Sequence, residues 1–135
     1  MSDGKRVGIV LVSHSAAVAA SVAELAKGLV GGAAVPVAPA GGTEGGELGT
    51  SAELIAAAVA SVNRGAGVAV LTDLGSAVLT VKALLAEGDE LPEGTRLVDA
   101  PFVEGAVAAV VTAATGADLA AVEAAAAEAY DYRKV

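Results

Sequence analysis

The chain has 135 residues, a length that fits one compact domain. Apolar residues make up 55% of it and aromatic residues only 2%, so a core must be built from small aliphatic side chains. Sixteen acidic residues against 8 basic ones give a net charge of −8, which argues against nucleic acid and anionic membranes as partners. The absence of cysteine excludes disulfides, thiolate chemistry and cysteine zinc sites.

The N-terminal residues Met1–Arg6 lead directly into an apolar run, without the charged, apolar and small-residue order of a signal peptide. Apolar stretches elsewhere are broken by polar residues before they reach the roughly 18 residues that a membrane span needs. We therefore expect a cytoplasmic protein without a membrane-spanning segment.

A continuous apolar run, Val7–Val12, precedes the triplet Ser13-His14-Ser15. Such a run is typical of a strand buried on both faces, as in a parallel sheet. A helix is predicted from Ser15 to Leu29, ended by Gly31-Gly32. Its larger apolar residues recur at helical spacing and predict the buried face: Val18, Val22, Leu25 and Leu29.

A short edge strand is predicted at Ala34–Ala38 because prolines stand within and directly after it. The segment Ala40–Gly49 holds five glycines and is predicted to be a loop that is mobile or closely approached by a ligand. Thr50 and Glu53 have the spacing of a capping box, which predicts a helix from there to Val62.

The second half repeats the alternation of apolar strand and helix. A strand is predicted at Val68–Thr72, followed by a helix at Ala77–Ala86 that presents Val78, Val81 and Leu85. A second strand is predicted at Arg96–Val98. Two helices, Glu104–Thr115 and Asp118–Ala129 with Asp118 as N-cap, and a short polar tail at residues 131–135 complete the chain.

This order predicts an α/β fold, a three-layer sandwich in which a small, mostly parallel open sheet has helices on both faces. The usual strand order for such a sheet is 2-1-3-4. Residues 1–130 are predicted to form one domain, followed by the tail 131–135.

The predicted strand order brings two polar segments together, because the first and third strands are neighbours and end at the same edge. His14 follows the first strand and Asp73 the third, so the two side chains should face each other. A carboxylate that accepts from Nδ1–H would leave the Nε2 lone pair free to attack phosphorus. The helix N-termini that follow would favour a phosphoryl group, with Ser15, Gly75 and Ser76 as phosphate-binding residues.

Each of these features has a structural alternative. His14 could be a structural histidine, Asp73 a helix cap, and the glycine-rich segment an idle surface loop. Nucleotide-binding glycine motifs, the Gly-x-Ser-x-Gly elbow and a set of zinc ligands are absent from the sequence. No metal or cofactor is therefore expected.

Four stretches carry a family resemblance: Ile9–Ser15, Gly49–Ser51, Leu71–Ala77 and Asp99–Gly105. Together they resemble the phosphotransfer (M) subunits of phosphoenolpyruvate-dependent dihydroxyacetone kinases, which belong to the mannose-type IIA group of phosphotransferase-system proteins. The resemblance extends from about Val7 to Ala129 and keeps the stretches in the same order.

The resemblance implies a homodimer in which His14 takes a phosphoryl group from the phosphocarrier HPr. It further implies transfer to ADP on the nucleotide-binding (L) subunit of the kinase, and so indirectly to dihydroxyacetone on the K subunit. By this resemblance Asp73 stands beside the phosphorylated histidine, Gly75 and Ser76 lie around the phosphate, and Gly41 and Thr50 lie in loops that border the site. Some relatives carry fused carrier domains; since none follows Val135, a separate HPr is expected.

Two other functions stay open from the sequence. One is the IIA component of a mannose-family sugar transporter, which would phosphorylate a sugar-specific IIB protein. The other is a regulatory binding module without turnover.

Overall fold

The computed structural model describes residues 5–31 and 34–135. Four strands alternate with helices as predicted, and the elements have the following bounds: β1 (Gly8–Ser13), α1 (Ala16–Leu29), β2 (Val37–Gly41), α2 (Ala52–Val62), β3 (Val68–Thr72), α3 (Gly75–Ala86), β4 (Thr95–Leu97), α4 (Phe102–Ala114), α5 (Leu119–Glu128) and the 3₁₀ turn η1 (Ala129–Asp131).

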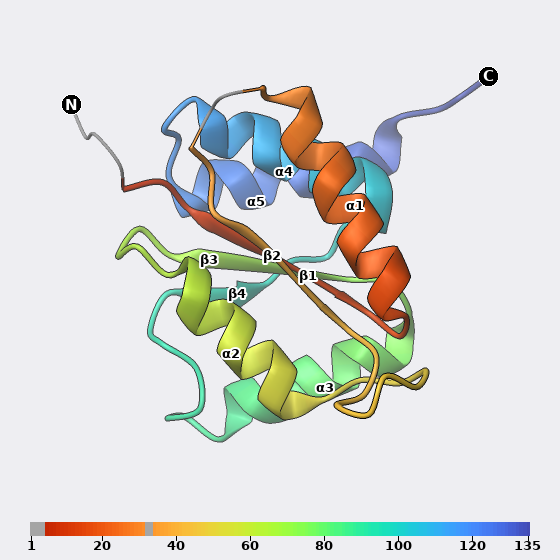
Figure 1. The fold of residues 1–135 in the computed structure, drawn as a ribbon. Coiled ribbons are helices and arrows are strands. Elements are labelled where there is room, and N and C mark those ends of the chain that lie inside the picture. The colour runs from red at the N-terminus through yellow and green to blue at the C-terminus, as the bar shows by residue number, and fades with distance from the viewer. Residues whose placement is uncertain (1–4, 32–33) are drawn as a thin grey trace.

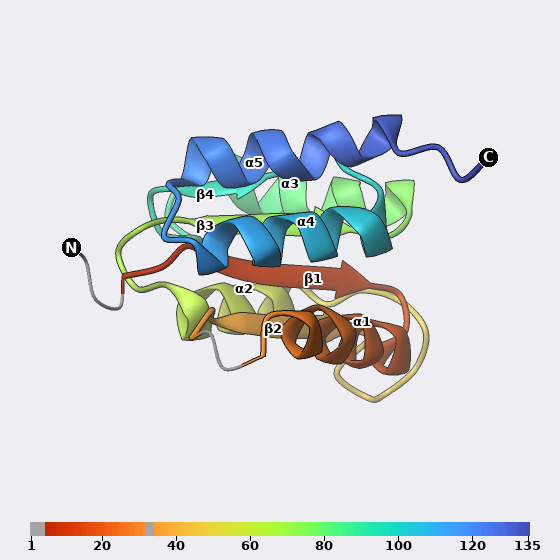
Figure 2. The same cartoon turned by 90° about the horizontal axis from the view of Figure 1, so that it is seen from above.

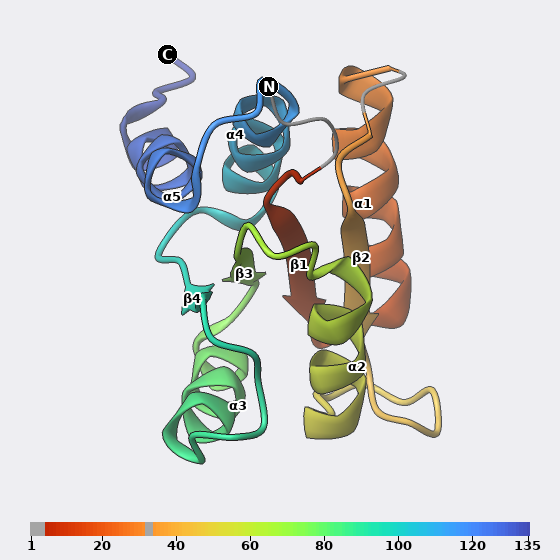
Figure 3. The same ribbon diagram turned by 90° about the vertical axis from the view of Figure 1, so that its left-hand side faces the viewer.

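The strands form one open parallel sheet in the order β2-β1-β3-β4, which confirms the predicted topology. Helices α1, α4 and α5 cover one face and α2 and α3 the other, so the molecule has three layers (Figure 1). The strands lie side by side, with β2 and β4 at the edges, in the view of Figure 3.

The central strand β1 explains the two cores. All six of its residues are buried, and alternate side chains point to opposite faces of the sheet. Ile9 and Leu11 pack under α1, α4 and α5, whereas Val10 and Val12 pack under α2 and α3. A continuous apolar run is therefore required because helices cover both faces.

The predicted apolar face of α1 is wrong in its larger members. The structure buries Ala19, Val22, Ala23 and Ala26, whereas Val18, Leu25 and Leu29 are 44%, 47% and 59% exposed. Small side chains face the sheet because they let the helix axis approach closely, which a face of leucines would prevent. A similar shift occurs in α3, which buries Ala77, Val81 and Leu84 in place of Val78 and Leu85.

Several predicted boundaries also move. Strand β2 spans Val37–Gly41 in place of Ala34–Ala38, because parallel pairing with β1 sets Gly41 level with Ser13. Helices α3 and α4 begin two residues earlier than predicted, at Gly75 and Phe102. Strand β4 begins and ends one residue earlier than predicted.

The helix α2 is capped by Ser51, whose Oγ accepts from the amide of Leu54 at 3.1 Å, so the predicted Thr50 cap is wrong. Asp118 caps α5 as predicted, accepting from the Ala121 amide at 3.0 Å. After α1 the chain turns at Gly31, where φ is +63°, while Gly32 and residues 1–4 lie outside the described part of the chain.

The fold gathers three segments at the carboxyl edge of the sheet. Seen from above, the end of β1, the start of α1 and the loop that follows β2 come together at one end of the molecule (Figure 2). Helix α3 also begins at this edge (Figure 1). This edge is where ligands bind in open α/β sheets.

Candidate active site

Parallel pairing of β1 with β3 positions the two polar segments. Val12 is opposite Thr72, so β1 ends at the same edge of the sheet, one residue beyond β3. The amide of Asp73 then donates to the carbonyl of Val12 at 3.0 Å. As a result, the first residues after the two strands, His14 and Asp73, are held next to each other by backbone geometry.

The imidazole of His14 lies against the carboxylate of Asp73, as the strand order predicts. Nδ1 of His14 is 3.0 Å from Oδ1 of Asp73, and the backbone amide of His14 donates to Oδ2 at 3.0 Å. Both side chains are largely covered, with 24% and 17% of their area exposed. The ring is therefore fixed in orientation while one edge remains accessible.

Asp73 is held in its ionised form by donors on both oxygens. Burial raises the pKa of Asp73, but the amide of His14, the hydroxyl of Ser13, the His14 ring and the amide of Leu74 together outweigh it and lower the pKa below its ordinary value. The Ser13 hydroxyl donates at 2.8 Å and the Leu74 amide at 2.7 Å. A carboxylate that stays ionised fixes the proton of the imidazole on Nδ1.

The second ring nitrogen faces the first turn of α3. Nε2 of His14 is 2.6 Å from Oγ of Ser76. With the ring proton on Nδ1, Nε2 carries a lone pair and accepts a hydrogen bond from the Ser76 hydroxyl. The structure thus brings together His14, Asp73 and Ser76 from the predicted set.

Ser15 and Gly75 stand at helix starts. Oγ of Ser15 accepts from the amide of Val18 at 3.2 Å and so caps α1, which leaves its hydroxyl proton free to donate elsewhere. Helix α3 begins at Gly75 and has no side-chain cap. Its first turn therefore presents amides and the positive end of the helix dipole beside Nε2.

The glycine-rich loop is fastened to the backbone around His14. The amide of Gly42 donates to the carbonyl of Ser13 at 3.2 Å, and the amide of Gly49 to the carbonyl of His14 at 2.9 Å. Gly41 is sterically required, because a Cβ there would lie 2.4 Å from the carbonyl oxygen of Ser15. Thr50 follows Gly49 and bonds to Thr80 of α3, at 2.9 Å between the hydroxyl oxygens.

Sequence reasoning missed two members of this network. Ser13 is 1% exposed and joins Asp73 to the amide of Ser15, which donates to its Oγ at 3.0 Å. Its signal was a serine that ends a wholly apolar strand, where a buried hydroxyl needs a partner. Thr80 had no local signal, since its partner is 30 residues away.

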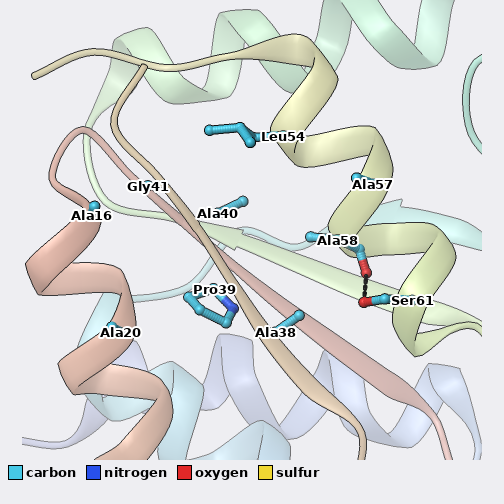
Figure 4. A pocket seen from close by; sticks show the side chains of 10 residues that line it. All are labelled: Ala16, Ala20, Ala38, Pro39, Ala40, Gly41, Leu54, Ala57, Ala58 and Ser61. Atoms are coloured by element: carbon cyan, nitrogen blue, oxygen red, sulfur yellow. Dashed lines mark hydrogen bonds between the residues drawn. The ribbon is translucent and has the colours of Figure 1, made fainter. Parts of the chain in front are cut away.

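The larger of two surface hollows excludes His14 and Asp73 and adjoins the site only at Ala16 and Gly41. A groove of about 550 Å³ lies along the edge strand β2, between α1 and α2 (Figure 4). Alanines line most of it, and its one hydroxyl, that of Ser61, donates to the carbonyl of Ala58 at 2.7 Å. A second hollow of about 500 Å³ opens beside Asp73 and is lined by Lys82, Asp99 and Tyr130 among others.

The hydroxyl of Tyr130 donates to Asp99 in this second hollow, at 2.8 Å. That hydrogen bond and the charge of Asp99 raise the pKa of Tyr130.

Within residues 5–31 and 34–135, no cluster of three or more metal-ligating side chains occurs. None of the helices in the same ranges combines the length and apolar character needed to cross a bilayer.

Fold and site together define an α/β protein with an open parallel sheet and a carboxylate-oriented histidine at its carboxyl edge. The chain belongs to the EIIA-man family, described as the PTS system fructose IIA component, which it matches over residues 8–123.

Similar proteins include several named phosphoryl donor subunits of dihydroxyacetone kinases. The subunit DhaM of the PEP-dependent dihydroxyacetone kinase 2 of Listeria innocua is 40% identical over 106 residues, which are 78% of this chain and 84% of that protein. The DhaM subunit of Escherichia coli K12 is 38% identical over 116 residues, which are 84% of this chain. The chain spans only about 25% of the length of that second relative.

Solved structures share the fold. The crystal structure of the unknown-function protein EF1359 superposes with a TM-score of 0.80 at 30% identity, covering 91% of this chain and 94% of the other. A sigma-54 interaction domain protein from Enterococcus faecalis gives a TM-score of 0.69 at 18% identity, with 96% and 93% coverage. This second likeness concerns the fold alone.

Proposed function

We propose that the chain is a phosphoryl carrier of a PEP-dependent dihydroxyacetone kinase, with His14 as the nucleophile. The observation that carries the proposal is the contact of Nδ1 with Asp73, which directs the Nε2 lone pair toward the first turn of α3. The names of the similar kinase subunits support this choice of acceptor over a sugar-transport IIB protein.

The chemistry uses this chain's own groups at each step. The Nε2 lone pair attacks the phosphorus of the phosphorylated donor, for which we propose HPr; the Nε2–P bond forms and the bond from phosphorus to the donor breaks. Nδ1 keeps its proton, and Asp73 balances the positive charge that the phosphorylated ring acquires. When an oxygen of ADP on the L subunit attacks the phosphorus, the Nε2–P bond breaks and the lone pair returns. ATP made there would phosphorylate dihydroxyacetone on the K subunit.

The groups around Nε2 are suited to a phosphoryl group. The Ser76 hydroxyl occupies the lone pair in the present structure, and after transfer it would turn to donate to a phosphoryl oxygen. The uncapped amides at Gly75 and the hydroxyl of Ser15 provide further donors. Gly41 and Thr50 support the backbone that frames this space and do not contact the ring.

The test is phosphorylation with phosphoenolpyruvate, enzyme I and HPr. One acid-labile phosphoryl group per chain is expected in the parent and none in His14→Ala. The phosphorylated protein is then mixed separately with ADP-loaded L subunit and with a mannose-family IIB protein. Transfer to IIB alone would reassign the chain to sugar transport, and His14→Ala accepting phosphate like the parent would refute the mechanism. A chain that binds these partners without accepting phosphate would be a regulatory module.

We further propose that the carrier is a homodimer. Exposed apolar side chains on α1, namely those of Val18, Leu25 and Leu29, provide a surface that a second copy could cover. Sedimentation equilibrium is expected to give twice the monomer mass for the parent and a shift toward the monomer for Leu25→Glu. A monomeric parent at micromolar concentration would refute the dimer.

A further inference from the structure

At the end of the glycine-rich loop, the consecutive residues Gly49 and Thr50 contact the two segments that form the site, the backbone at His14 and helix α3. The amide of Gly49 donates to the carbonyl of His14 at 2.9 Å. The hydroxyl oxygen of its neighbour Thr50 lies 2.9 Å from that of Thr80. Thr80 is one helical turn beyond Ser76, whose Oγ contacts Nε2 of His14. The loop therefore connects the backbone of the histidine to the helix that carries its hydroxyl partner.

The donor and the acceptor of each hydrogen bond in this connection can be assigned. The hydroxyl of Thr80 donates to the carbonyl of Ser76 at 3.4 Å, within the same helix. Because a hydroxyl has one proton, the Thr80 oxygen then acts as the acceptor for the hydroxyl of Thr50. The chain of hydrogen bonds thus goes from Thr50 to Thr80 and ends on the backbone of Ser76.

The first turn of α3 is held on its inner side, where Ala77 is fully buried and the amide of Leu74 donates to Asp73. No side chain caps the helix, and it begins at Gly75, where a Cβ would meet no atom within 4 Å. Only three of its 12 residues are buried: Ala77, Val81 and Leu84. These contacts hold the inner face of the helix, and the hydrogen bond between Thr50 and Thr80 adds a link from the helix to the loop.

We propose that Thr50 and Thr80 are a positioning pair that sets the place of the Ser76 hydroxyl relative to Nε2 of His14. The proposal rests on the function proposed above. Neither threonine touches the reacting atoms; both act through Ser76. A misplacement of about 1 Å at a reacting centre costs up to about 10²-fold in rate, so the loss of one hydrogen bond in this tether is expected to be measurable.

The test compares valine, which removes the hydroxyl, with serine, which keeps it. In single-turnover transfer from phosphorylated HPr, Thr50→Val and Thr80→Val are each expected to slow phosphorylation about tenfold. Thr50→Ser and Thr80→Ser should stay within about twofold of the parent. The double valine variant should be no slower than either single one, because the two residues serve one connection.

A second measurement does not depend on phosphoryl transfer. In the unphosphorylated protein, the ¹⁵N resonance of Nε2 reports the hydrogen bond from Ser76 and is expected to shift in both valine variants but not in the serine variants. If the parent is never phosphorylated, the proposed function fails, while this resonance still tests the pair. An unchanged resonance together with an unchanged rate overturns the proposal, as does a double variant whose effect is the product of the single effects.

Thermal unfolding separates positioning from general stability. The valine variants are expected to unfold within a few degrees of the parent, since the threonine hydroxyls lie near the surface of the molecule. If Val variants lose rate only in proportion to a lowered unfolding temperature, and the serine variants lose it equally, the threonines are structural and the proposal is wrong.

Discussion

The side chain of Asp73 takes part in more hydrogen bonds within the site than any other side chain described. Its two oxygens face the Ser13 hydroxyl, the His14 ring and the amides of His14 and Leu74. The carboxylate therefore orients the ring and also ties the ends of β1 and β3 together. Its removal should affect chemistry and stability by separate routes, which makes the two effects separable by experiment.

We predict that Asp73→Ala keeps the fold but slows phosphorylation of His14 about 10²-fold, because Nδ1 loses the partner that fixes its proton. Single-turnover transfer measured beside a circular dichroism spectrum checks this. Glu53→Ala is the matched control, since Glu53 is an exposed carboxylate on α2. A rate equal to that of the parent would contradict the role of Asp73.

The lowered pKa of Asp73 also predicts an acid dependence of stability. The pKa is lower in the folded than in the unfolded state, so ionised Asp73 stabilises the fold above its unfolded pKa of about 3.9. That contribution is lost as the pH falls through the folded pKa. Urea unfolding of the parent and of Asp73→Asn should therefore differ at pH 6, and the difference should shrink as the pH falls below the unfolded pKa of about 3.9. A constant difference at all pH values would show that the carboxylate charge is not responsible.

At the scale of elements, helix α1 illustrates how an alanine-rich sequence packs. The periodicity of large apolar residues predicts that Val18, Leu25 and Leu29 face the core, yet these are exposed and alanines are buried. A hydrophobic pattern predicts the helix and its period. It does not show which of two apolar faces is buried, because the alanine face has the same spacing. The sheet decides, since close approach of the helix needs small side chains.

We predict that Ala26→Leu destabilises the protein by about 1–3 kcal/mol, because Ala26 lies fully buried on the inner face of α1 and a larger side chain overpacks the interface. Ala20→Leu, on the exposed side of the same helix where it lines the groove of Figure 4, should change the free energy of unfolding by less than about 0.5 kcal/mol. Chemical denaturation measures both. Equal effects would mean that the assignment of the buried face is wrong.

At the scale of the whole molecule, charge is the property most relevant to partners. The chain carries a net charge of −8. Part of this charge lies beside the site, on the exposed carboxylates of Glu44 and Glu47 in the glycine-rich loop. A negative surface around a nucleophile favours encounter with a positively charged partner, and salt weakens this attraction.

We predict that the second-order rate of transfer from the proposed donor, HPr, falls as NaCl rises from about 25 to about 300 mM, with a weaker salt dependence in Glu44→Gln/Glu47→Gln. The control is Glu87→Gln/Glu90→Gln, which removes the same charge at the far end of α3. Stopped-flow measurement at several salt concentrations decides the question. A salt-independent rate, or equal responses of the two double variants, would show that these carboxylates do not steer the partner.

Apolar runs and the order of elements were enough to predict the class of fold, the strand order and the pairing of His14 with Asp73. These predictions depend on apolar runs bounded by glycine and polar residues, and on the rule that neighbouring parallel strands end at the same edge of the sheet. Three features became visible only in the folded chain: which face of α1 is buried, where β2 lies against β1, and the link from Thr50 to Thr80. The reason is that such contacts join segments far apart in the chain and depend on packing distance and hydrogen-bond geometry, neither of which leaves a local pattern in the sequence.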